Sequence, residues 1–223
     1  MFTHLSTINP VELKTIESSK GRRYITPTGE KYPSITTILG AEEKPYLKDW
    51  RMRLGEVKAD KETKRAADRG TAVHLMIERF LNNDPNPTAG QQLEHIGEFN
   101  TLKLYLKKIN NIITQESALW SDEMKIAGRV DCCGEYEGKL SIIDFKTSTN
   151  NKRESMIQEY WLQTTAYALM MQERYNIHIE NAVIVMSVEK GAVPLIFKNQ
   201  VDAHIEPLLK RISNWRGNHS DQS

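Results

Sequence analysis

Two aspartates and one lysine gather in residues 128–148, GRVDCCGEYEGKLSIIDFKTS, which alternate like two strands joined by a short turn. Asp144 and Lys146 are two residues apart in the second strand, so their side chains lie on one face. Antiparallel pairing can bring Asp131 of the first strand opposite Asp144. Because ionised groups in so apolar a run cost several kcal/mol unless they find a partner or a metal, the pattern calls for a functional explanation.

Two interpretations account for this group. Paired carboxylates supply the hard oxygen ligands that Mg²⁺ prefers, and a neighbouring lysine adds a cation where transition-state charge grows. Alternatively, Asp144 and Lys146 form a semi-buried ion pair that holds the hairpin together. The acid-x-lysine spacing alone does not decide, because it also occurs five times in polar or turn-like surroundings. Only Asp144 and Lys146 combine it with an apolar strand and a second aspartate one hairpin earlier.

The composition indicates one domain with a sizeable core, since 39% of the 223 residues are hydrophobic. No apolar run approaches the ~20 residues that span a bilayer, and the N-terminus resembles neither a secretory signal nor a transit peptide. We therefore expect no membrane partner. Cys132 and Cys133 are adjacent and cannot easily pair with each other, so a reducing cytoplasm is the expected compartment. Two thiols are too few for a zinc ribbon or a four-cysteine iron–sulfur cluster.

The net charge of +1 excludes a uniformly basic nucleic-acid binder, but the charges are distributed unevenly. Residues 1–75 carry an excess of lysine and arginine, whereas residues 76–149 carry an excess of aspartate and glutamate. An acidic centre beside a basic flank suits a metal site next to a phosphate-binding surface. Solvated charge runs are the alternative explanation.

Hydrophobic periodicity predicts the elements that must position these side chains. The first 40 residues are expected to be irregular to extended, with a turn near Gly29. The pattern then predicts helices over residues 45–82, about 91–109, 153–175 and 201–215, and strands over residues 112–120, 125–136, 139–147, 182–188 and 193–197. A helix, three strands, a helix and a strand in this order form an α/β layer.

A cluster of hydroxyl side chains follows Pro33, at Ser34, Thr36 and Thr37. One interpretation is a small hairpin whose hydroxyls cap the following turn. The other is a phosphate clip, because hydroxyls and backbone N–H groups near Arg22 can hold a nucleic-acid backbone without reading its bases.

The predicted helices carry further candidates. His74 shares a face of small residues with Glu78, and it is either a metal ligand or a hydrogen-bonded packing residue. Tyr160, Gln163 and Tyr167 lie along one side of the 153–175 helix. They form either an amphipathic boundary or a polar aromatic edge that contacts phosphate or a base.

Several of these motifs occur together in a known order. GTAVH ends at His74, GRVD ends at Asp131, IDFKTS contains Asp144, and a helical Q-x-x-x-Y joins Gln163 to Tyr167. In this arrangement the chain resembles the RecB-like branch of the PD-(D/E)xK nuclease superfamily. The block RRYITPTGEKYPSITTIL is similar to the subgroup that contains the mitochondrial genome maintenance exonuclease and its bacteriophage relatives. The likeness covers about residues 22–190.

The resemblance implies a restriction-endonuclease-like αβββαβ core and metal-dependent hydrolysis of phosphodiester bonds in DNA. By the same resemblance, the metal ligands would be Asp131, Asp144, the backbone carbonyl of Phe145, and His74. Lys146 would orient or activate the attacking water, while Gln163 and Tyr167 would line the DNA path. The first letter of the name PD-(D/E)xK stands for a proline, and Val130 occupies that position here. The resemblance assigns no role to Glu116.

We therefore expect one α/β nuclease domain over residues 1–223. Its parts would be an N-terminal DNA-binding extension with a hairpin and helical additions (1–60), a catalytic core (61–215) and a disordered tail (216–223). The expected enzyme is a monomeric Mg²⁺- or Mn²⁺-dependent exonuclease that prefers linear single-stranded DNA with a free end. It would act with replication or recombination proteins, in the cytoplasm, including a host cytoplasm if it is phage-encoded. The alternatives are a structure-specific endonuclease or resolvase, and a non-catalytic DNA-binding recombination subunit.

Overall fold

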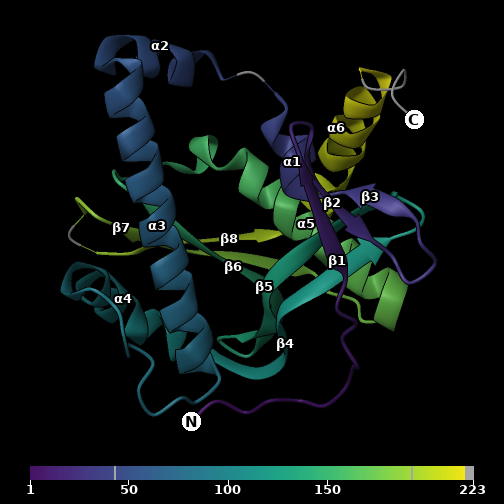
Figure 1. The fold of residues 1–223 in the computed structure, drawn as a ribbon. Helices are drawn as coiled ribbons and strands as arrows, with labels where there is room; N and C mark the ends of the chain where they lie inside the picture. Colours follow the sequence, from purple (N-terminus) through teal and green to yellow (C-terminus); the bar gives the residue numbers. More distant parts are fainter. Residues whose placement is uncertain (43, 192, 219–223) are drawn as a thin grey trace.

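The computed structural model describes residues 1–42, 44–191 and 193–218 (Figure 1). Its strands are β1 (Lys14–Ser18), β2 (Gly21–Ile25), β3 (Lys31–Pro33), β4 (Ile109–Ser121), β5 (Ile126–Tyr136), β6 (Lys139–Ser148), β7 (Asn181–Val188) and β8 (Leu195–Gln200). The first three form a small antiparallel sheet. The other five form the central sheet, in the order β4-β5-β6-β7-β8.

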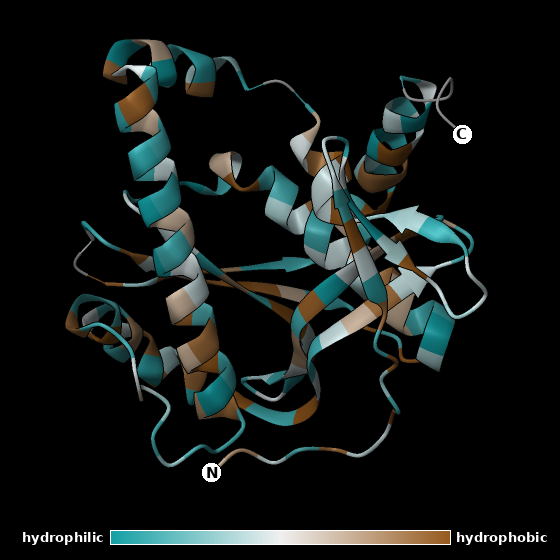
Figure 2. Ribbon diagram, in the orientation of Figure 1, coloured by the Kyte–Doolittle hydropathy of each residue, from teal (hydrophilic) through white to brown (hydrophobic). Residues whose placement is uncertain are grey.

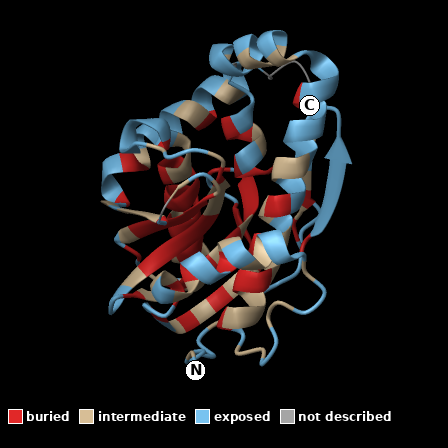
Figure 3. Cartoon of the chain, turned by 90° about the vertical axis from the view of Figure 1, so that its left-hand side faces the viewer, coloured by how far each residue is buried: buried red, intermediate tan, exposed pale blue. Residues whose placement is uncertain are grey.

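The helices cover both faces of the central sheet. They are α1 (Ile35–Gly40), α2 (Pro45–Leu54), α3 (Glu56–Leu81), α4 (Leu93–Leu106), α5 (Gln158–Tyr175) and α6 (Ile205–Gly217), with two 3₁₀ turns, η1 (Glu154–Met156) and η2 (Asp202–His204). Helices α3 and α4 pack on one face, and α1, α5 and α6 pack on the other (Figure 1). Figure 3 shows the buried residues gathered in the central strands and in the helix faces against them.

Strand β6 shows how the sequence pattern creates these two layers. Ile143 and Phe145 belong to the hydrophobic cluster with α3 and α4, whereas Ile142 belongs to the cluster with α5. Strand β6 pairs antiparallel with β5 and parallel with β7, and α5 makes the crossover between the two parallel strands. The order α3, β4, β5, β6, α5, β7 confirms the predicted αβββαβ core.

The N-terminal part differs from the expectation in three elements. Strand β1 adds an exposed edge to the expected hairpin, so the extension is a three-stranded sheet. Residues after Ser34, expected to form a turn, form helix α1, whose first turn Ser34 caps. The apolar stripe expected on α2 is not buried: Tyr46 is 64% exposed and Leu47 is 43% exposed. Figure 2 shows brown residues on the outlying part of α2 and α3.

The expected domain boundary at residue 60 falls inside α3, which runs without a break from Glu56. At the other end, α6 continues to Gly217, so the tail expected to start at residue 216 begins as helix. Residues 219–223 of that tail lie outside the described residues. No helix in the described part of the chain combines the length and apolar character needed to cross a membrane.

Candidate active site

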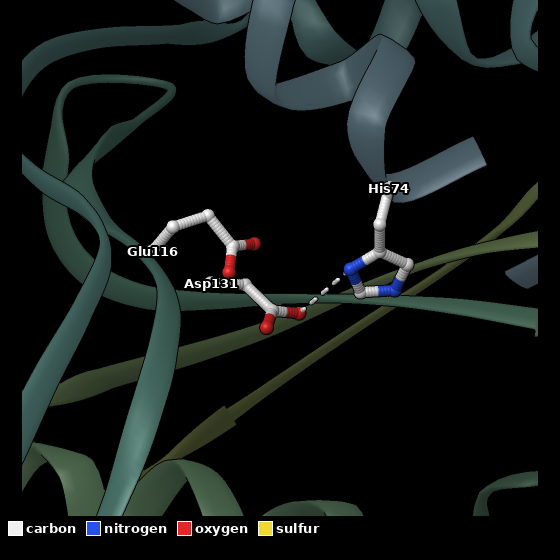
Figure 4. Close-up of side chains that lie close together, drawn as sticks. All are labelled: His74, Glu116 and Asp131. Atoms are coloured by element: carbon white, nitrogen blue, oxygen red, sulfur yellow. Dashed lines mark ion pairs between the residues drawn. The ribbon is translucent and has the colours of Figure 1, made fainter. Parts of the chain in front are cut away.

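Three side chains from three elements converge between α3 and the central sheet (Figure 4). His74 comes from α3, Glu116 from β4 and Asp131 from β5, and one ligand atom of each lies within 4.8 Å of the others. His74 Nδ1 is 3.8 Å from Asp131 Oδ2. A pocket of ≈ 500 Å³ adjoins this group; α3 supplies most of its lining and Glu116 the rest.

Glu116 reaches this point because β4 is irregular. The register between β4 and β5 shifts near Asn110 and Thr114, and Glu116 itself has a φ of 43°, in the left-handed region that non-glycine residues rarely occupy. Its neighbours pair with the neighbours of Asp131, so the two carboxylates face each other across the ladder. Irregular strand conformations of this kind occur near active sites, where they redirect a side chain.

The surroundings of Glu116 disfavour the charged form of its carboxyl group. The pKa of Glu116 is raised to about 8, mainly by burial and then by the carboxylates of Asp131 and Glu78, while Arg129 acts in the opposite direction. In the absence of a cation, this carboxyl group therefore holds its proton near neutral pH.

Asp131 connects this group to β6. Its Oδ2 accepts a hydrogen bond from the backbone N–H of Phe145 at 2.8 Å. The Phe145 side chain packs in the layer of α3 and α4, where its ring makes an edge contact with His74 at 6.2 Å between ring centroids. This bond holds the backbone next to Asp144 against Asp131, just beyond the last pair of the β5–β6 ladder, Cys132 with Ile143.

Asp144 and Lys146 form a buried ion pair beside the cluster. Lys146 Nζ lies 2.6 Å from Asp144 Oδ2, and only 1% of the Asp144 side chain is exposed. Burial raises the pKa of Asp144 to about 7; Lys146 lowers it and Asp131 raises it. Asp144 Oδ1 has no hydrogen-bond partner, which is an unusual state for a buried carboxylate oxygen.

Lys146 is held by side chains of α5. Gln163 Oε1 accepts a hydrogen bond from Lys146 Nζ at 3.4 Å, and the same ammonium lies 5.1 Å from the ring centroid of Tyr160. Burial is the largest single influence on the pKa of Lys146 and acts downward, yet the carboxylates of Asp144 and Asp131 leave that pKa raised. Lys146 therefore remains a cation at neutral pH.

The donor set fits a divalent metal ion. Two carboxylates and an imidazole gather in the cluster, and Asp144, which has one unpartnered oxygen, is paired with the nearby Lys146. Carboxylate oxygens suit Mg²⁺, and Mn²⁺ also accepts imidazole nitrogen.

The predicted ligand set differs from the group that the structure brings together. The structure places Asp131 next to His74, as expected. The third member of the group is Glu116, to which the family resemblance assigned no role. Asp144 lies beside the group and is engaged with Lys146. An acid in the first strand of this fold was the only sequence signal for Glu116, because the local irregularity that turns it inward has no clear mark in the sequence.

Tyr167 is a packing residue in this structure. It is 2% exposed, and its hydroxyl accepts a hydrogen bond from Gln163 Nε2 at 3.4 Å. The ring lies so close to β5 that a Cβ added to Gly128 would be 2.7 Å from Tyr167 Cε1. Gly128 therefore permits the contact between α5 and β5, and the buried ring presents no open face for base stacking.

The hydroxyl cluster of the N-terminal part is occupied by internal hydrogen bonds. Ser34 Oγ accepts from the Thr37 backbone N–H at 3.0 Å and lies within 2.9 Å of both the Thr36 and Thr37 hydroxyls. Thr37 Oγ1 accepts from the Arg22 backbone N–H at 3.0 Å, and the Arg22 guanidinium pairs with Glu17. These contacts correspond to the capping interpretation, and a phosphate clip here stays a prediction.

The αβββαβ core and this acidic centre correspond to the arrangement expected of a PD-(D/E)XK domain. The family model of the PD-(D/E)XK nuclease superfamily matches residues 96–194, a span that contains Glu116, Asp131, Asp144 and Lys146. The chain carries a domain of this superfamily.

Among characterised proteins, the chain is similar to mitochondrial genome maintenance exonuclease 1 of Mus musculus, with 30% identity over 173 residues. The proteins of the same name from Homo sapiens and Xenopus tropicalis are 28% and 29% identical. Each alignment covers 72% of this chain and 49–51% of the relative. The chain thus spans about half the length of the curated relatives it matches.

Proposed function

We propose that this chain is a metal-dependent DNA exonuclease that hydrolyses phosphodiester bonds in linear single-stranded DNA. The observation that carries the proposal is the convergence of His74, Glu116 and Asp131 next to the Asp144–Lys146 pair. The relatives are named as an exonuclease, which agrees with the chemistry of these side chains.

The residues of the site have distinct roles in this proposal. His74, Glu116, Asp131 and Asp144 would hold the ion, Mg²⁺ or Mn²⁺. The bound ion supplies Lewis-acid polarisation of the phosphate and lowers the pKa of a bound water. Lys146 places a cation next to the scissile phosphate, where negative charge increases in the transition state. Gln163 and Tyr160 orient the Lys146 ammonium so that it does not have to reorganise during the reaction.

Helix α2 and the start of α3 support a single-stranded substrate. They expose apolar side chains, at Tyr46, Leu47, Met52 and Val57, among several lysines and arginines. A surface of this composition binds unpaired strands, because rings stack on bases while cations contact phosphates without regard to sequence. Part of Tyr160, beside Lys146, is also accessible.

The experiment that tests this proposal compares DNA topologies. Labelled linear and circular strands of equal length, single and double stranded, are incubated with Mg²⁺, Mn²⁺ or EDTA. We expect degradation of the linear single strand with either ion, little cleavage of the circle, and none in EDTA. Equal cleavage of circle and linear strand would instead support an endonuclease on the same core, and binding without cleavage in any ion would support a non-catalytic DNA-binding subunit.

A further inference from the structure

A second lysine shares the ring that supports Lys146. Lys152 Nζ lies 5.3 Å from the ring centroid of Tyr160 and donates a hydrogen bond to its hydroxyl at 3.2 Å. No carboxylate of the described residues lies within ion-pair distance of Lys152. Because both ammonium groups contact one ring, Lys152 brings an uncompensated cation close to the catalytic lysine.

Lys152 also lines a pocket of ≈ 610 Å³ that begins where β6 ends. Ser148, the last residue of β6, lines it, together with the loop after β6, η1, the start of α5, residues at and just before the start of α2, and one residue of α6. The volume is within the range of small-molecule sites and suits a nucleotide. A strand that has its phosphate at Asp144 and Lys146 can therefore extend into this pocket by following β6.

The other charges in the pocket are balanced. Arg211 pairs with Glu42 at 2.6 Å and with Glu159 at 3.7 Å, and Glu159 also pairs with Lys44. The two carboxylates of the lining are thus paired with Arg211 and with Lys44, which lies outside the lining, and Lys152 is the lining cation that has no ion pair among the described residues. A phosphate group is the anion that such a site favours next to a nuclease centre.

The pocket has an aromatic side chain at its rim. Tyr46 of α2 lines the pocket and is 64% exposed, although an aromatic side chain of this size is normally largely covered. A solvent-exposed ring facing a pocket is suited to stacking on a base, a contact that every base can make.

We propose that this pocket, the Lys152 pocket, holds the nucleotide that adjoins the scissile phosphate of a single-stranded DNA substrate. Lys152 contacts the phosphate of that nucleotide, and Tyr46 stacks on its base. The assignment rests on the proposed function, because it uses the Asp144–Lys146 centre as the place of cleavage. It adds a binding subsite to that centre.

The main test measures binding of unlabelled (dT)10 to the full chain by calorimetry in EDTA at several salt concentrations. Lys152→Gln is compared with Arg153→Gln, which removes the same charge from an exposed neighbour outside the pocket. We expect Lys152→Gln to weaken binding about tenfold and to reduce the salt slope by about 0.7, the value for one phosphate contact on a single strand. Arg153→Gln should change neither quantity.

A second pair of variants tests the stacking contact. Tyr46→Phe keeps the ring and should bind (dT)10 as the wild type does, whereas Tyr46→Ala should weaken binding about tenfold. Thermal melting confirms that each variant is folded, as expected for exposed positions.

Equal effects of Lys152→Gln and Arg153→Gln, or no effect of either, would overturn the Lys152 assignment, and wild-type binding by Tyr46→Ala would overturn the stacking contact. Cleavage by the wild type in Mn²⁺ is measured in parallel. If the wild type cleaves DNA and the pocket variants bind normally, the subsite fails while the proposed function stands. If the pocket variants lose binding but the wild type never cleaves, the proposed function fails.

Discussion

At the residue scale, the site consists of carboxylates whose burial and closeness to one another disfavour their ionised forms. Glu116 is turned inward by a positive φ, and Asp131 faces it across the β4–β5 ladder. Asp144 is buried with one unpartnered oxygen. Each arrangement disfavours the charged carboxylates, and the divalent cation that we propose for this site would relieve that repulsion.

The first prediction concerns Glu116. Its pKa is raised from an ordinary 4.5 to about 8, so folding disfavours its charged form, and the stability that it contributes below pH 4.5 is lost as pH rises to 8. In EDTA, Glu116→Gln should therefore be more stable than the wild type at pH 8, by roughly 1–2 kcal/mol after allowance for partial exposure. The two should converge near pH 4.5.

Thermal melting in EDTA across this pH range measures the difference. Glu123→Gln, at an exposed position in the β4–β5 turn, is the control and should follow the wild type at every pH. A stability difference between Glu116→Gln and the wild type that stays constant from pH 4.5 to 8 would show that the pKa of Glu116 is not raised in the folded protein.

The second prediction concerns Lys146. Lys146→Ala should lower the rate of cleavage ~10²–10³-fold, the usual loss when one stabiliser of transition-state charge is removed. Affinity for single-stranded DNA in EDTA should change little, because the ammonium is paired with Asp144 in the free protein. Single-turnover cleavage and binding titrations separate the two effects. Lys139→Ala, at the far end of the same strand, serves as the control. A large loss of affinity with normal turnover would indicate that Lys146 only binds DNA.

At the element scale, two contacts hold the helices that carry the site. Helix α3 is anchored by Arg69, which is 2% exposed and pairs with Glu189 at the end of β7 and with Glu98 of α4. Helix α5 packs on β5 through Tyr167 and Gly128. The first contact fixes the helix of His74, and the second fixes the helix of Gln163.

The third prediction tests the contact between α5 and β5. A Cβ at Gly128 would lie 2.7 Å from Tyr167 Cε1, so Gly128→Ala should destabilise the fold by about 1–3 kcal/mol. Gly97→Ala is the matched control: nothing lies within 4 Å of a Cβ there, and alanine favours helix α4 by about 0.5–1 kcal/mol. Urea denaturation of both variants measures the changes. A stability of Gly128→Ala equal to that of the wild type would show that the two elements separate easily.

The same elements show what the sequence could and could not predict. The core strands and α5 were predicted because their apolar residues alternate or recur at regular intervals, as Ile143 and Phe145 do in β6. Helix α1 was missed because six residues with several β-branched side chains resemble an extended segment, and tertiary packing of Ile35 and Ile38 overrides that preference. Tyr167 was placed on a polar edge because helical periodicity cannot show that a glycine on β5 admits its ring.

The candidate site was partly predictable for a similar reason. The shared face of Asp144 and Lys146 follows from strand periodicity and is present in the structure. The approach of His74 to Asp131 was expected only from the resemblance to a family. To predict that Glu116 joins the site, one would have to know that the backbone of β4 is irregular at this residue. Such irregularities depend on the whole sheet rather than on a local sequence pattern.

At the scale of the whole molecule, the sheet brings together groups from distant parts of the chain. Helix α3 carries His74, strands β4, β5 and β6 carry the carboxylates, and α5 carries the side chains that contact Lys146. Helix α2 and the start of α3 leave exposed apolar and basic residues, the composition expected of a surface that contacts a single strand. This arrangement is the basis for the central claim, that the cluster of His74, Glu116 and Asp131 holds the ion required for DNA cleavage.

The most direct test of that claim is cleavage of labelled linear single-stranded DNA by Asp131→Asn during a Mn²⁺ titration. Asp131 is the residue that contacts both His74 and the β6 backbone, so its loss should abolish cleavage at every Mn²⁺ concentration while the protein remains folded. Asp202→Asn, at an exposed position before α6, should cleave as the wild type does. Full cleavage by Asp131→Asn at the same Mn²⁺ concentration as the wild type would contradict the assignment of this cluster as the metal centre.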